Sequence, residues 1–259
     1  MDIHDPRPQE KRQKKYTKGR NSESFDPKST FSRPDMRIRI EDANSNLNNV
    51  KHDDVIIIPD FVSEDMLYEK LLEEIHQLQN DKVENSEWIS WHEGCHLIVK
   101  SPEHSKTFKS ILEKMHRMFD IDPNTSSFRF NFYKDDTDWK SLHHDSAAFN
   151  PLRAKNQNIT VGLSLGYTRE LCFRHVNGTT LAFPQKDKSL FSFGRDVNIR
   201  FKHGINAIPH KKRQHQNCGR ISIILWGWSS LPINEAGDPP LVKNKEITNK
   251  KNQNTTTHK

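Results

Sequence analysis

The chain is poor in cysteine and in hydrophobic residues. Only three of its 259 residues are cysteines, Cys95, Cys172 and Cys218, and no two of them form a C-x-x-C pair. This argues against a disulfide framework and a cysteine zinc site, and it favours a reducing compartment. Hydrophobic residues make up 32% of the chain and its mean hydropathy is −0.90. A composition this polar predicts that part of the chain is disordered.

Long apolar segments are also lacking. No run approaches the roughly 20 residues that a membrane span needs, and the N-terminus has no apolar stretch that could act as a signal peptide. We therefore predict no membrane association and a location in the nucleus or cytoplasm. We also predict a monomer. The basic run at residues 11–15 slightly favours the nucleus, since it could be an import signal or a phosphate-binding arm. The alternative is a solubilising tail.

The positive charge lies in the tails. The formal charge is +6, yet residues 6–20 alone carry a net +6 and residues 240–259 a net +4, so residues 21–239 sum to about −2. The high isoelectric point therefore does not indicate a basic nucleic-acid platform in the folded part. We predict three regions: a disordered basic N-terminal arm at 1–49, one folded domain at 50–232, and a disordered Lys/Asn/Thr-rich tail at 233–259.

Hydrophobic periodicity predicts helices first and strands afterwards. Apolar residues recur at helical spacing from Met66 to Leu78, behind Ser63 as a candidate N-cap, and again over residues 104–119. Residues 128–133 then alternate as a strand, with the phenylalanines on one face and Asn131 and Tyr133 on the other. Further strands are predicted at 55–58, 159–165, 171–174, 179–182, 189–193, 198–203 and 220–228. This pattern predicts a mainly β, α+β fold, with a double-stranded β-helix (jelly-roll) core and N-terminal helical support.

The sequence His143-His144-Asp145 carries the most informative pair of side chains. In an extended strand, residues i and i+2 face the same way, so His143 and Asp145 can reach one point. With a second histidine from a distant strand they would form the 2-His-1-carboxylate triad of non-haem Fe(II). We favour His203, which ends a predicted strand before Gly204. The rivals are His175, His210 and His215, the last two in a basic segment that reads as an exposed loop.

A second set of residues could hold a co-substrate. Arg220 opens an otherwise apolar strand, and a buried guanidinium needs an anionic partner. The distal carboxylate of 2-oxoglutarate would supply one, and an internal salt bridge would do so equally well. Asn131 and Tyr133 can offer an amide and a phenol to the same ligand.

In combination these motifs resemble the AlkB-like family of Fe(II)/2-oxoglutarate-dependent dioxygenases, over about residues 55–228. The resemblance rests on Asn131-Phe-Tyr133, the H-x-D motif ten residues later, an S-x-G-x-x-R segment at 164–169 that leads into F-R-H, and then His203 and Arg220. Many members carry a second arginine six residues after the first, where this chain has Trp226. The two-arginine clamp usual in that family is therefore incomplete in this chain.

The resemblance implies an oxidoreductase that uses Fe(II), 2-oxoglutarate and O2. It implies His143, Asp145 and His203 as metal ligands, and Asn131, Tyr133 and Arg220 as co-substrate contacts. The reaction that it implies is oxidative demethylation of N-alkylated bases in DNA or RNA, as in DNA repair, with the base flipped out of its stack. The alternative is hydroxylation or demethylation of a protein or small molecule at the same iron site.

Candidate substrate contacts are few. Trp88 and Trp91 could stack a base, although packing in the core is the alternative. His144, in the middle of H-x-D, would point away from the metal and is a further candidate. Lys211 and Arg213 belong to the basic loop that could meet phosphate, although such loops are more often only solvated.

Overall fold

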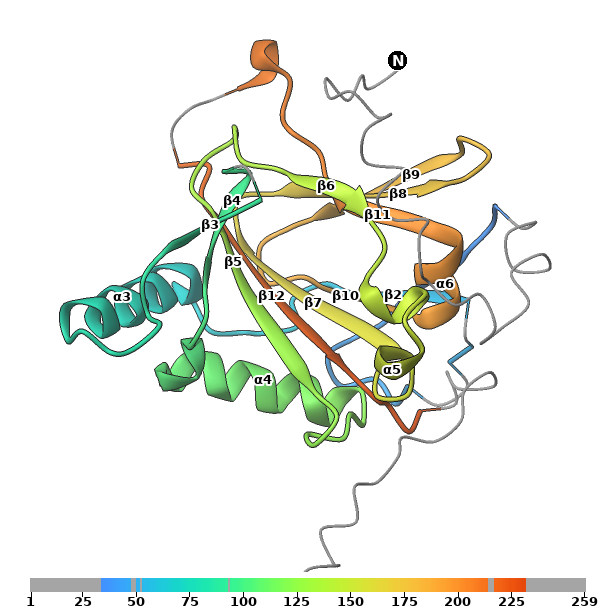
Figure 1. Cartoon of the computed structure of the whole chain (residues 1–259), viewed down its shortest axis with the longest axis horizontal. Coiled ribbons are helices and arrows are strands. Elements are labelled where there is room, and N and C mark those ends of the chain that lie inside the picture. Colours follow the sequence, from blue (N-terminus) through green and yellow to red (C-terminus); the bar gives the residue numbers. More distant parts are fainter. Residues whose placement is uncertain (1–33, 48–49, 52, 93, 214–216, 232–259) are drawn as a thin grey trace, which may run out of the picture.

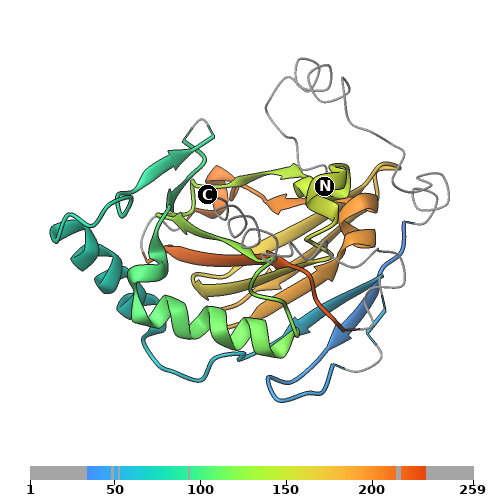
Figure 2. The ribbon, with the colours of Figure 1, turned by 60° about the horizontal axis from the view of Figure 1, so that its bottom comes forward.

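The computed structural model describes residues 34–47, 50–51, 53–92, 94–213 and 217–231. The predictions of disorder for residues 1–33 and 233–259 concern residues outside this part. The described chain forms two β-sheets with two long helices on one side (Figures 1 and 2). This agrees with the predicted fold class.

An eight-stranded sheet provides the larger layer. Its strand order is β1 (Arg37–Ile40), β2 (Asp54–Ile58), β10 (Leu190–Gly194), β7 (Ile159–Gly166), β12 (Arg220–Gly227), β5 (Ser127–Tyr133), β4 (His96–Val99) and β3 (Ile89–Trp91). The smaller sheet has the order β6 (Lys140–His143), β11 (Phe201–Ile205), β8 (Arg169–His175) and β9 (Thr180–Gln185).

The strand order identifies the jelly roll. From β5 to β12 the chain changes sheets at every step except between β8 and β9, which pair within the small sheet, and each pairing among these strands is antiparallel. Four strands, β10-β7-β12-β5, thereby lie opposite β6-β11-β8-β9, which is the double-stranded β-helix predicted from the sequence. The space between the two sheets is where inward-facing side chains from distant segments meet.

Two helices support the large sheet from outside, on the side away from the small sheet (Figures 1 and 2). They are α3 (Leu67–Asn80) and α4 (Lys106–Met118). Phe108 of α4 packs edge-on against Phe128 and at a tilt against Phe130, with centroid distances of 5.3 and 5.9 Å. The phenylalanine face of β5 therefore points to the helices, and its Asn131/Tyr133 face is left for the space between the sheets.

Shorter helical segments complete the fold. They are η1 (Pro102–His104), η2 (Ser146–Ala148), α5 (Pro151–Ala154), α6 (Arg195–Arg200) and η3 (His210–Lys212). The connection that carries η3 projects from the small-sheet side (orange, top of Figure 1).

Several local predictions are wrong. Residues 198–200 belong to α6 rather than to a strand, and only Phe201–Ile205 is extended. Ser63 does not cap α3, whose N-cap position is Met66, whereas α4 is capped by Ser105, which accepts from the backbone N–H of Phe108 at 3.0 Å. Strands β3, β4 and β6 were not predicted, because each is only three or four residues long.

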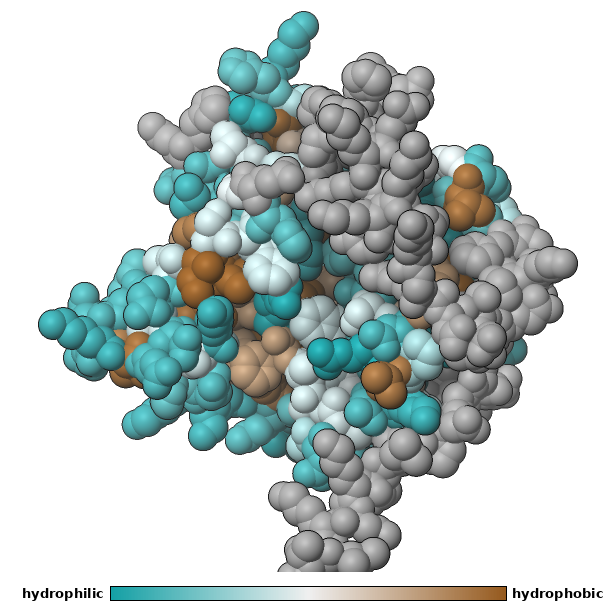
Figure 3. Space-filling view, viewed as in Figure 1, coloured by the Kyte–Doolittle hydropathy of each residue, from teal (hydrophilic) through white to brown (hydrophobic). Residues whose placement is uncertain are grey.

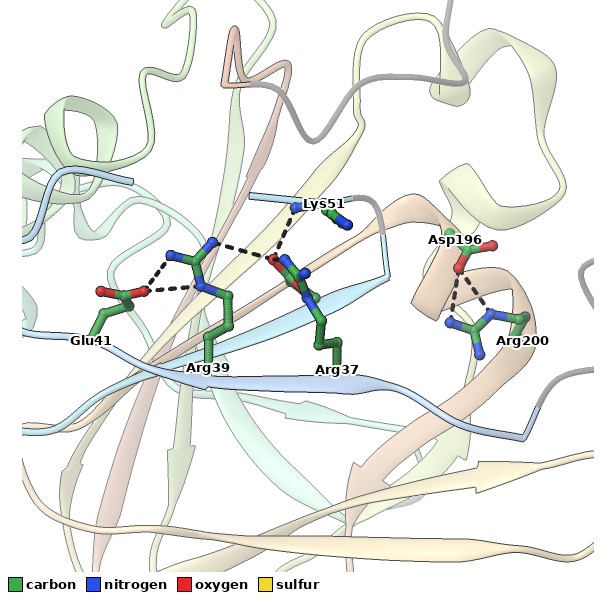
Figure 4. Close-up of polar contacts among 7 residues, drawn as sticks. Arg37, Arg39, Glu41, Lys51, Asp196 and Arg200 are labelled. Carbon is green, nitrogen blue, oxygen red and sulfur yellow. Dashed lines mark hydrogen bonds and ion pairs between the residues drawn. The ribbon is translucent and has the colours of Figure 1, made fainter. Parts of the chain in front are cut away.

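The N-terminal boundary also needs correction, because residues Arg37–Ile40 form β1 within the predicted disordered arm. This edge strand pairs in parallel with β2. The buried carboxylate of Asp54 holds it: Arg37 binds both carboxylate oxygens, and Arg39 Nη1 lies 3.4 Å from Oδ2 (Figure 4). Arg39 also pairs with Glu41 at 2.5 Å (Figure 4). Polar ion pairing, which hydrophobic periodicity does not register, therefore attaches this strand.

The described surface has no extended apolar face in the view of Figure 3, where hydrophobic side chains form small separate patches among hydrophilic ones. The exposed large hydrophobic residues are Ile38 and Ile40 on β1, and Met66, Leu152 and Val176 on three other segments. No described helix is long and apolar enough to cross a membrane.

Candidate metal centre

His143, Asp145 and His203 meet at one point between the sheets. His143 ends β6, Asp145 precedes η2, and His203 lies on β11 directly opposite His143. Nε2 of His143 is 3.7 Å from Asp145 Oδ1, and Nε2 of His203 is 3.6 Å from Asp145 Oδ2. One ligand atom from each residue can be chosen so that all lie within 4.8 Å of one another. Two imidazole nitrogens and a carboxylate at this spacing fit the donor set of a non-haem Fe(II) site.

The protonation of these groups suits metal binding. His143 Nδ1 lies 2.8 Å from the carbonyl of Ser141 and can donate to it, which leaves the Nε2 lone pair for the metal. Burial lowers the pKa of His143 to about 4, so this imidazole is neutral at pH 7. Burial alone would raise the pKa of Asp145, but the imidazoles of His203 and His143 hold it well below its usual value.

Further residues orient the Asp145 carboxylate. Oδ2 accepts hydrogen bonds from Thr160 Oγ1 at 2.9 Å and from Trp226 Nε1 at 3.0 Å. The Asn198 side chain holds the backbone of Asp145, accepting from its N–H at 2.8 Å and donating to its carbonyl at 3.2 Å. Outer contacts of this kind fix the direction of a metal ligand. Trp226, the position where the resemblance led us to expect a second arginine, therefore braces the metal ligand instead.

Arg220 lies in the same pocket as the triad and is 0% exposed. Its Nε donates to Ser164 Oγ at 2.8 Å, but Nη1 and Nη2 have no hydrogen-bond partner among the described residues. Burial lowers its pKa to about 10, so it is still charged at pH 7. The internal salt bridge left open by the sequence is not formed within the described part of the chain. Two orphaned N–H groups on a buried cation fit a carboxylate ligand.

Tyr133 and Asn131 form the wall next to Arg220. The Arg220 guanidinium lies 5.1 Å from the Tyr133 ring centroid, and burial raises the pKa of this phenol. Asn131 lines the pocket, but its amide spans two protein groups, with Oδ1 3.1 Å from His96 Nε2 and Nδ2 3.1 Å from the Ser222 carbonyl. Asn131 thus fixes the wall, and the Tyr133 hydroxyl lies next to the Arg220 guanidinium, which opposes the rise in the pKa of the phenol.

Lys140 is a pocket residue that sequence reasoning missed. His203 and Ile205 of β11 stand opposite His143 and Lys140, so β6 uses one residue more than β11 between these pairs. This bulge turns Lys140 to the face of His143, although residues three apart in a regular strand face opposite sides. Burial lowers the pKa of Lys140 to about 8 in spite of the attraction of Asp145. The pocket therefore holds a second cation, Lys140, which comes from β6. The second arginine of the resembling family would instead lie on β12, at position 226.

The rival histidines do not join this site. His175 is buried beside Phe201, and its Nδ1 accepts from the N–H of Asn177 at 3.3 Å. His210 is exposed in η3, and His215 is outside the described residues. His144 turns to α6, where its Nδ1 lies 2.5 Å from the carbonyl of Asn198 and its ring packs edge-on against Phe149.

The two candidate tryptophans differ in their surroundings. Trp88 packs against Phe130 and Phe132 at 6.0 and 4.8 Å, on the helix side of β5. It therefore belongs to the core and does not face the metal pocket, which corrects its assignment as a substrate contact. Trp91 is half-buried and lies 4.0 Å from the guanidinium of Arg129, a residue that the sequence did not single out.

The basic loop contributes no contact to the pocket. Lys211 is exposed, and Arg213 is half-buried with its Nε donating to the carbonyl of Ile208 at 3.0 Å. Neither residue lines the metal pocket. Their proposed contact with phosphate remains a prediction.

Comparison with known proteins gives little beyond this geometry. No family model matches the chain, and no curated protein matches it. Among solved structures, a prolyl-4-hydroxylase from Pseudomonas putida is similar at 13% sequence identity, with a TM-score of 0.48, over 68% of this chain and 92% of that chain. The jelly-roll assignment rests on the strand order, and the AlkB-like resemblance remains a prediction from the motifs.

Proposed function

We propose that this protein is an Fe(II)- and 2-oxoglutarate-dependent oxygenase. The observation that carries the proposal is one pocket that contains both a His143/Asp145/His203 donor set and the buried Arg220 guanidinium with two unpaired Nη groups. The donor set suits a ferrous ion, and the guanidinium suits the distal carboxylate of a dicarboxylic acid.

The chain's own residues supply binding, orientation and charge. His143, Asp145 and His203 would hold Fe(II), while Thr160 and Trp226 fix the carboxylate. Arg220, Lys140 and the Tyr133 hydroxyl would hold 2-oxoglutarate. Bound Fe(II) and 2-oxoglutarate would react with O2 to supply an oxidant for a substrate C–H bond, with succinate and CO2 as the products of 2-oxoglutarate.

For the substrate, the described residues favour a protein or small molecule over a flipped base. Trp88 is committed to the core, and one side of Trp91 carries the guanidinium of Arg129. The group presented beside the pocket is then a cation rather than a bare indole face. The competing reaction, oxidative demethylation of nucleic acid, is supported by the resemblance of the sequence motifs to the AlkB-like family.

The test is a single-turnover assay of 2-oxoglutarate decarboxylation with Fe(II) and O2 on the full chain. Wild type should release succinate and CO2 stoichiometrically with bound iron. The His143→Ala variant should lose both iron and product, and His104→Ala, which removes an exposed histidine of η1, should behave as wild type. Equal turnover in wild type and His143→Ala would refute the proposal. Methylated oligonucleotides and peptides, assayed side by side for oxidised product, would separate the substrate classes.

A further inference from the structure

Arg129 lies over the ring of Trp91 and near that of Trp226, which lines the metal pocket. Its guanidinium carbon lies 4.0 Å from the ring centroid of Trp91 and 5.8 Å from that of Trp226. All three side chains are half-buried, so the stack is accessible from solvent. The face of an indole ring attracts a guanidinium cation. A guanidinium packed on such a face keeps its N–H groups available for hydrogen bonds in its own plane.

The stack adjoins the metal site. Trp226 contacts Arg129 and also donates from Nε1 to the metal ligand Asp145. Arg129 itself feels the charge of Asp145, which opposes the effect of burial on its pKa. A group bound to the Arg129 edge would therefore stand one indole ring away from the carboxylate of the triad.

Charge around the pocket is unbalanced. Two cations, Lys140 and Arg220, line the pocket with the carboxylate of Asp145, which belongs to the triad. Arg129 is a third cation close enough to interact with that carboxylate. The two carboxylates of 2-oxoglutarate would match Lys140 and Arg220. Within the described chain Arg129 forms no ion pair or hydrogen bond with a carboxylate. A half-buried guanidinium that packs on an indole ring and has no carboxylate partner has the form of a receptor for an oxyanion.

We propose that Arg129, aligned by Trp91 and Trp226, binds an oxyanion of the substrate, a carboxylate or a phosphate. The substrate is thus an acidic molecule whose anionic group is fixed beside the iron site while a nearby carbon is oxidised. The inference rests on the proposed function only in taking this pocket as the place of reaction. The oxyanion site itself exists without iron or 2-oxoglutarate.

Titration of the metal-free full chain with inorganic phosphate and, separately, with acetate, at constant ionic strength, tests the proposal. The indole N–H resonances of Trp91 and Trp226 should shift saturably with at least one probe. Arg129→Gln should weaken this binding about tenfold or more, because it removes charge-assisted hydrogen bonds. Arg129→Lys keeps the charge without the planar fork and should lie between the two. Arg174→Gln, a half-buried arginine on β8, is the matched control and should bind as wild type.

Arg220→Gln separates this site from the co-substrate pocket. Binding that survives Arg220→Gln and is lost in Arg129→Gln supports the proposal, even if the protein proves to have no oxygenase activity. Tighter acetate indicates a carboxylate substrate, and tighter phosphate indicates a phosphorylated one. Saturable binding that is lost in Arg220→Gln, or that persists in a folded Arg129→Gln protein, overturns the proposal. So does the absence of saturable binding with both probes.

Discussion

Replacing Arg220 by methionine tests the co-substrate pocket directly. Nε of Arg220 is already used by Ser164, so a bound carboxylate would gain two charge-assisted hydrogen bonds from Nη1 and Nη2. At about 1.5–3 kcal/mol each, their loss should weaken 2-oxoglutarate binding by at least about 3 kcal/mol, which corresponds to roughly a hundredfold or more. The free protein should respond differently. Exchanging a buried, incompletely paired cation for an apolar side chain is often neutral or stabilising.

The assay is anaerobic calorimetric titration of the Fe(II)-loaded chain with 2-oxoglutarate, alongside urea unfolding of the ligand-free protein. We expect a large loss of affinity with a small change in the free energy of unfolding. Arg220→Lys, which keeps the charge but not the fork, should recover part of the affinity. An affinity within threefold of wild type in a folded Arg220→Met protein would show that this guanidinium does not bind the co-substrate.

Three further predictions concern the brace, the second cation and the N-terminal strand. Trp226→Phe removes a donor to Asp145 and should weaken Fe(II) binding about 10–100-fold, measured by metal titration; unchanged affinity would rule out the brace. Because the pKa of Lys140 in the free pocket is about 8 and an anion favours the charged amine, 2-oxoglutarate binding should weaken as the pH rises above 8, and Lys140→Met should remove this dependence. Hydrogen bonds from Arg37 and the Lys51 N–H lower the pKa of Asp54 against the effect of burial, so its contribution to stability is present above about pH 4 and is lost as the pH falls through the folded-state pKa. In urea unfolding at several pH values, Asp54→Asn should flatten this acid limb, and an unchanged limb would contradict the role given to that carboxylate.

The parts of the site that follow a regular period could be predicted from the sequence. His143 and Asp145 share a face because they are two residues apart. Asn131 and Tyr133 share the inner face of β5 because Phe128 and Phe130, on its other face, pack against Phe108 of α4. The strand assignments that held belong to long, strongly alternating or apolar segments. His203 was chosen for its place at the end of a strand, and it does stand opposite His143. The strand itself is shifted, however: α6 occupies the first half of the predicted strand, and β11 runs on to Ile205, so His203 is its central residue and does not end it.

The parts that were missed depend on departures from regular geometry or on contacts across the fold. The role of Asn198 arises only because α6 ends beside Asp145, and Arg129 gains meaning only when β3 brings Trp91 over it. Neither contact leaves a trace in local sequence, since the partners are 53 and 38 residues apart along the chain.

Lys140 shows the physical reason most directly. Strict alternation turns it away from His143, and only the bulge in β6 brings it into the pocket. Gly204 makes the bulge possible: a Cβ there would lie 2.6 Å from the carbonyl oxygen of Lys140 and 2.8 Å from that of Ser141. In the sequence, the glycine after His203 is as consistent with the start of a loop as with a bulge in a facing strand. Its effect on the facing strand becomes visible only when β11 and β6 are paired, so the second cation of the pocket is a property of the sheet rather than of either strand alone.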